Sequence, residues 1–142
     1  MFKQQGRGEI FEEKFVSIVD ALESIPDIPE LIFQRGPAFD RLCDSIEAAM
    51  EVVALILEDL GERGGNDLSN VLRLGELGII CPYLVNGLVR CTGLRIMLRE
   101  RLDCFDEKVV LDSIQEVRDI LYEFMDVVDR MMDQIDAEIE WQ

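Results

Sequence analysis

The sequence predicts an all-α protein, an antiparallel up-and-down bundle of four long helices with one additional short helix. Apolar residues recur at steps of three and four through most of the 142-residue chain, and the β-branched residues fall on the same helical period. Glycines and prolines separate these periodic segments. The length is sufficient for one hydrophobic core, so we expect a single helical domain over residues 1–142.

Prolines bound the first two predicted helices. We expect the N-terminal helix over about residues 8–25, because Pro26 and Pro29 each disfavour helix in the residue that precedes them. The second helix begins near Pro37, since proline is well tolerated in a first turn. Its apolar residues keep the helical period for several turns, as far as Gly61.

Three further helices complete the predicted bundle. Asn66 is a good cap for a short helix that ends near Leu77. The next helix runs from Pro82 to Leu102, and the last one runs from about Asp106 to near the C-terminus. The apolar stripe of the last helix consists of Val110, Ile114, Val117, Leu121, Phe124, Val128, Met131 and Ile135.

The charge of the chain limits its partners. It has 30 acidic and 14 basic residues, which gives a formal net charge of −16 at pH 7. A field of this sign repels free nucleic acid, so a basic partner or a small ligand is favoured over unaided RNA binding. Alternatively, the carboxylates only form solvated helix faces. Residues 1–8 lack the apolar segment of a secretory signal, and no apolar run is long enough to span a membrane. We therefore expect a cytoplasmic protein with no membrane contact.

The cysteines do not indicate a metal site. The chain contains four cysteines but no Cys-x-x-Cys pair, and it has no histidine. The sequence therefore predicts no zinc site and no cofactor. Cys43 and Cys91 fall on apolar stripes, so we expect both to be small buried hydrophobic residues.

Carboxylate pairs on the last predicted helix support a different class of function. Glu116 and Asp119, and again Glu123 and Asp126, are three residues apart and would present their oxygens to one cation. A Mg-dependent helical NTP pyrophosphatase is therefore an alternative. The same spacing occurs on the second helix, which indicates solvated faces rather than a metal site.

Arg95 is the most informative residue of the predicted helix from Pro82 to Leu102. Leu84, Leu88, Cys91 and Leu98 form the buried stripe of this helix, and Arg95 occupies a position in the middle of the stripe. A buried guanidinium is costly unless it is paired. Arg95 therefore implies a partner carboxylate, a bound anion or a subunit interface.

Arg99 lies one helical turn after Arg95, and the two could bind a phosphate together. They form an anion-binding candidate. The alternative is that Arg99 neutralises nearby carboxylates.

The same helix is apolar on a second flank. Val85, Val89, Ile96 and Met97 lie off the stripe that contains Arg95. A helix that is apolar nearly all round is covered on both sides. In a bundle of this size a second copy is the simplest cover, so we predict a homodimer through this region.

Two motifs at a fixed separation resemble a known family. The segment Leu77-Gly78-Ile79-Ile80, followed by Gly93-Leu94-Arg95, is similar to the HepT-like branch of the HEPN family. The resemblance covers about residues 38–132. It implies a helical toxin–antitoxin component, a dimeric and metal-independent RNase whose arginine and histidine lie at the dimer cleft. It also implies a minimal nucleotidyltransferase antitoxin as partner.

This chain departs from the family pattern at the catalytic positions. Arg95 matches the family arginine, but Glu100 stands where the family has histidine, Ile96 replaces a polar residue, and Leu102 replaces a tyrosine. Cleavage through the 2′-hydroxyl needs a group that exchanges protons near neutral pH. Histidine does so at about 6.5, whereas glutamate titrates at about 4.3. The sequence therefore predicts a catalytically degenerate member, with an active RNase that uses Arg95 and Glu100 as the alternative. RNA would be a ligand only of the active form.

Overall fold

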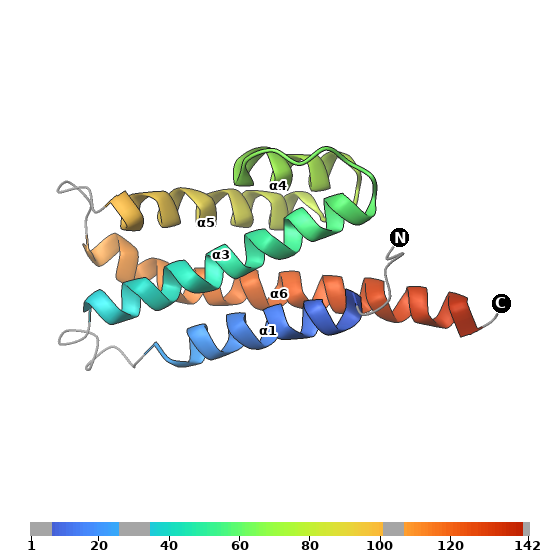
Figure 1. Cartoon of the computed structure of the whole chain (residues 1–142). Helices are drawn as coiled ribbons and strands as arrows, with labels where there is room; N and C mark the ends of the chain where they lie inside the picture. Colours follow the sequence, from blue (N-terminus) through green and yellow to red (C-terminus); the bar gives the residue numbers. More distant parts are fainter. Residues whose placement is uncertain (1–6, 26–34, 101–106, 141–142) are drawn as a thin grey trace.

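The computed structural model describes residues 7–25, 35–100 and 107–140, and these residues form five helices (Figure 1). Helices α1 and α5 run in one direction, whereas α3 and α6 run in the other. The short α4 packs beside α5 and α3 at one end of the bundle. The predicted all-α bundle is thus confirmed. The helices are α1 (Arg7–Glu23), α3 (Arg35–Asp59), α4 (Asp67–Glu76), α5 (Pro82–Glu100) and α6 (Glu107–Glu140).

The predicted boundaries agree with these helices within a few residues, but some predicted features cannot be compared. The prolines that were expected to end the first helix lie outside the described residues, as do Arg101, Leu102 and Cys104. Among the described helices, none combines the length and the apolar composition needed to cross a membrane.

One hydrophobic core lies between the four long helices. Each of them contributes side chains that are fully removed from solvent, and each large apolar side chain buried in this way stabilises the fold by about 1.5–3 kcal/mol. The largest are Phe11, Ile18, Leu22, Leu42, Ile46, Ile56, Leu57, Leu84, Leu88, Ile120 and Phe124, with Leu74 from α4.

Local signals place α4 against α5. The Asn66 side chain accepts a hydrogen bond from the Ser69 backbone N–H at 2.8 Å and caps the helix. After α4, Gly78 has a φ of +73°, a left-handed conformation that favours glycine. A Cβ on Gly75 would lie 2.6 Å from Val85 Cγ2, so the glycine lets α4 pack closely on α5. This packing brings the first turn of α4 beside the middle of α5.

Two arginines from other helices donate hydrogen bonds to the backbone carbonyl groups at the C-terminal end of α1. Arg41 of α3 donates to the Ser24 carbonyl at 2.7 Å, and Arg118 of α6 donates to the Leu22 and Ile25 carbonyls at 3.2 Å each. The last turn of α1 has no basic residue of its own. The positively charged side chains that stabilise the C-terminal end of α1 therefore belong to α3 and α6, and these hydrogen bonds link α1 to both helices.

Candidate functional site

Arg95 projects from α5 towards α3 and α4, and its side chain is only 24% exposed. Its Nη2 lies 3.1 Å from Asp67 Oδ2 on α4, and its Nη1 lies 3.7 Å from Glu47 Oε1 on α3. Of the three explanations that the sequence allowed for a buried arginine, a partner carboxylate is the one observed. The Nε atom is also buried, and it has no hydrogen-bond acceptor among the described residues.

Arg99 is bound by carboxylates of α3. Its Nε and Nη2 reach the two oxygens of Glu47 at 2.9 and 3.1 Å, and Nη2 also reaches Asp44 Oδ1 at 2.9 Å. Asp40 Oδ1 lies 3.9 Å from Nη1. Chiefly through the hydrogen bond with Glu47, and then that with Asp44, this arrangement raises the pKa of the Arg99 guanidinium above its usual value. Arg99 therefore neutralises nearby acids, as one sequence interpretation held.

The two arginines and their four carboxylates form one connected group, which we call the arginine network. It consists of Arg95, Arg99, Asp40, Asp44, Glu47 and Asp67. Glu47 Oε1 is shared, because it is the nearest carboxylate atom of both Arg95 Nη1 and Arg99 Nε. The carboxylates outnumber the guanidiniums, so a phosphate that approached this place would have to displace resident anions and meet their repulsion.

Glu100 does not join this network. It is an exposed residue at the C-terminal end of α5. It lies five positions after Arg95, which corresponds to about 140° around a helix axis. The structure therefore brings Arg95 together with Arg99, but within one chain it does not place Glu100 on the same face.

Three of the four remaining acidic candidates are engaged in ion pairs or hydrogen bonds. Glu116 pairs with Arg90 of α5, Asp126 lies 3.3 Å from Arg130, and Asp119 accepts from Gln115 at 2.9 Å. Across the ranges that the structure describes, no group of three or more Asp, Glu, Cys or His side chains is arranged to hold a metal ion. These contacts are those of solvated helix faces.

Two of the cysteines are buried. Cys43 is 1% exposed and Cys91 is 2% exposed, as expected for small hydrophobic residues. Burial raises the pKa of the Cys43 thiol to about 11 and that of the Cys91 thiol to about 12. Cys81, in contrast, is exposed.

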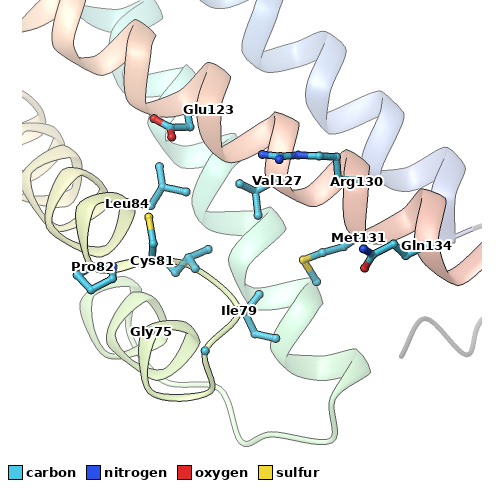
Figure 2. A pocket seen from close by; sticks show the side chains of 12 residues that line it. Gly75, Ile79, Cys81, Pro82, Leu84, Glu123, Val127, Arg130, Met131 and Gln134 are labelled. Atoms are coloured by element: carbon cyan, nitrogen blue, oxygen red, sulfur yellow. The ribbon is translucent and has the colours of Figure 1, made fainter.

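A groove that the sequence did not predict lies between the α4–α5 connection and α6 (Figure 2). Its volume is about 700 Å³. Ile79 and Leu84 line it from one side. Val127, Arg130 and Met131 line it from α6. The residues of the two walls are far apart in the sequence. The apolar periodicity within one helix therefore could not predict that they form a groove together.

Comparisons with known proteins give consistent results. No family model matches the chain. A protein of Archaeoglobus fulgidus named "Putative RNase" is 39% identical over 130 residues, which cover 92% of this chain and 98% of that protein. A chain in the crystal structure of a toxin–antitoxin with AMP-PNP has a TM-score of 0.79 and 16% identity, and the match covers 86% of this chain and 98% of that one. A chain of the MntA-HpeT toxin–antitoxin in a mutant form has a TM-score of 0.74 and 16% identity, covering 85% and 98%. At this identity the structural likeness shows the fold alone.

Proposed function

This chain belongs to the HepT-like branch of the HEPN family, and we propose that it is a toxin-type scaffold without ribonuclease activity. In this proposal it forms a homodimer and binds a minimal nucleotidyltransferase antitoxin. The observation that supports the loss of activity most strongly is the arginine network, in which Glu47 and Asp67 already pair with the two terminal nitrogens of Arg95.

RNA cleavage has two requirements, a cation that stabilises developing negative charge and a group that accepts a proton. A cation must stabilise the negative charge that develops on the phosphorane. Here Arg95 and Arg99 are surrounded by more carboxylates than they can neutralise. A proton acceptor near neutral pH is needed as well, and Glu100 stands in the histidine position but on another face of α5. Both requirements are therefore unmet within one chain.

The surface of α5 supports the homodimer. Tyr83 is 56% exposed and Ile96 is 47% exposed, so large apolar side chains face outward from this helix. Of the five described helices, α5 alone carries more basic than acidic residues. Carboxylates of α3, α4 and α6 already pair with its three arginines, so the exposed apolar side chains rather than charge would hold a second copy. The outer face of α5 is thus the most favourable place for a second copy.

The antitoxin partner is supported by the family and by the two toxin–antitoxin structures of similar fold. We expect a chain with an affinity tag, expressed at its native level, to co-purify with a nucleotidyltransferase that mass spectrometry identifies. A reading frame for such an enzyme should also lie next to this one. Recovery of the chain with no nucleotidyltransferase in either place would contradict the proposed partner.

Incubation with structured and single-stranded RNA in EDTA tests the loss of activity. We expect both RNAs to remain intact, with an added metal-independent ribonuclease as positive control. An active RNase that uses Arg95 and Glu100 is the second candidate, and the name of the Archaeoglobus fulgidus relative favours it. Cleavage that is lost in both Arg95→Ala and Glu100→Gln would establish this candidate and overturn our proposal.

A further inference from the structure

The groove between the α4–α5 connection and α6 has the length of a short helix. On α6 its lining begins at Glu123 and ends at Gln134, and Figure 2 shows these two side chains at opposite ends of the groove. Gln134 lies eleven residues after Glu123, which corresponds to about 16 Å, or about three helical turns. A partner helix of about three turns therefore matches the groove in length.

The apolar side chains of this groove are incompletely covered within one chain. Ile80 and Leu84 are buried. Ile79, Val127 and Met131 are only half-buried. A groove of this kind accepts the apolar face of an amphipathic helix, and a methionine side chain adapts its shape to the residue that packs on it.

One carboxylate of the groove has no partner. Glu123 is exposed, and it forms no ion pair or hydrogen bond with any residue that the structure describes. Arg130 also lines the groove, but its charge is met by Asp126, which lies 3.3 Å away. The groove thus carries uncompensated negative charge at the end where Glu123 lies near Leu84 (Figure 2). On a chain with a net charge of −16, this end favours a positively charged occupant and repels an acidic one.

The surface of α6 that a partner can reach is longer than the groove. The last turns of α6 extend beyond the other described helices (Figure 1). Ile135 follows Met131 by about one turn on the apolar stripe of the α6 sequence. A helix that lies in the groove is therefore free to continue along this stripe.

We propose that the groove binds an amphipathic helix of another protein, with apolar side chains against Val127 and Met131 and a lysine or arginine at Glu123. The charge-assisted hydrogen bond to Glu123 fixes the direction in which the bound helix lies. The groove is at the N-terminal end of α5, away from the arginine network. The inference is therefore independent of the proposed loss of activity and of the proposed antitoxin.

Selection from a displayed library of helical peptides, carried out on the full chain, tests this proposal. Each peptide has about four turns, with leucine along one face and the other positions varied. We expect the recovered peptides to carry lysine or arginine near one end of the leucine face. Their affinity should fall about three- to tenfold for Glu123→Gln, and at least about tenfold for Val127→Asp, which places a charge among the apolar side chains.

Two controls accompany these variants. Asp129→Asn removes the same charge from an exposed position on another face of α6, so it should leave the affinity unchanged. Circular dichroism checks that Val127→Asp is folded, and because Glu123 is exposed, Glu123→Gln tests the proposal even if Val127→Asp is not.

Cys81 reports directly on the groove. It lines the groove and is exposed, whereas Cys43 and Cys91 are buried. A bound peptide should therefore slow the labelling of Cys81 by a thiol reagent about tenfold when the peptide concentration is about ten times its Kd. Mass spectrometry of the fragment that contains Cys81 measures this rate.

Each result supports or overturns the proposal. Recovered peptides without a basic residue, or equal binding to Glu123→Gln and Asp129→Asn, refute the pairing with Glu123 and the proposal with it. Peptides that leave the labelling of Cys81 unchanged bind elsewhere, which also refutes it, as does a library that gives no binder. If labelling of Cys81 slows as the concentration of the chain alone rises, a second copy is the occupant and the proposal is wrong.

Discussion

Replacing Arg95 and Arg99 in turn by methionine tests whether the two arginines of the network differ in what they contribute to stability. Methionine keeps a long unbranched stem and has a helix propensity close to that of arginine. The two variants therefore differ mainly in the polar contacts that they lose. Urea unfolding, followed by circular dichroism, gives the free energy of unfolding of each variant. The protein concentration must be held fixed because self-association shifts the midpoint.

For Arg95→Met, losses and gains are of similar size. The variant loses the 3.1 Å pair with Asp67 and the 3.7 Å pair with Glu47, and such partly exposed pairs contribute about 0.2–1 kcal/mol each. It also removes the buried Nε that has no acceptor among the described residues, and an unsatisfied buried donor costs about 1–3 kcal/mol. We expect no change, or a gain of up to about 2 kcal/mol in the free energy of unfolding.

For Arg99→Met, losses dominate because every Arg99 nitrogen has a carboxylate partner. The bidentate pair with Glu47 and the hydrogen bond with Asp44 link α5 to α3. The side chain is 39% exposed, so solvent screening limits the expected destabilisation to about 1–2 kcal/mol. For a domain of this size the melting temperature should fall by about 3–8 °C. If Arg95→Met is instead the more destabilised variant, by more than about 2 kcal/mol, the assignment of an unsatisfied guanidinium is wrong.

Three further predictions concern the network, the thiols and the cap of α4. The double variant Glu47→Gln/Asp67→Asn frees the donors of Arg95, so it should bind a single-stranded RNA that wild type does not bind, with an affinity that falls as salt rises. Cys81 should react with a thiol reagent in the folded chain because it is exposed, whereas Cys91 should react only in denaturant. Because burial raises the pKa of Cys91 from 9.0 to about 12, the contribution of its protonated thiol to stability is complete below pH 9 and declines as the pH rises towards 12, which alkaline unfolding measures. Asn66→Ala removes the acceptor of the Ser69 N–H and should lower the free energy of unfolding by about 1 kcal/mol.

Each of these predictions has a control. The control Asp119→Asn/Glu123→Gln removes the same amount of negative charge, but on α6 and outside the arginine network. If this variant binds RNA as well as Glu47→Gln/Asp67→Asn does, the change in net charge alone is responsible. Labelling of Cys91 as fast as Cys81 in the folded chain would contradict its burial. Asn66→Ser keeps a capping oxygen, so it should retain most of the stability that Asn66→Ala loses.

The fold was predictable from the sequence because helix periodicity and helix ends are local properties. The α4 segment shows this well, since the cap at Asn66 and the left-handed Gly78 are both short-range signals. The sequence also showed that Arg95 needs a partner and allowed a carboxylate as one possibility, and Glu47 and Asp67 are the carboxylates that pair with it.

The remaining contacts depend on how distant segments are placed against one another. Asp67 meets Arg95 only because Gly75 lets α4 lie close to α5, and no pattern within α4 encodes that register. The groove between the α4–α5 connection and α6 has the same origin. Gly87 resembles Gly93 in the sequence, and only the packing of Ile120 distinguishes them.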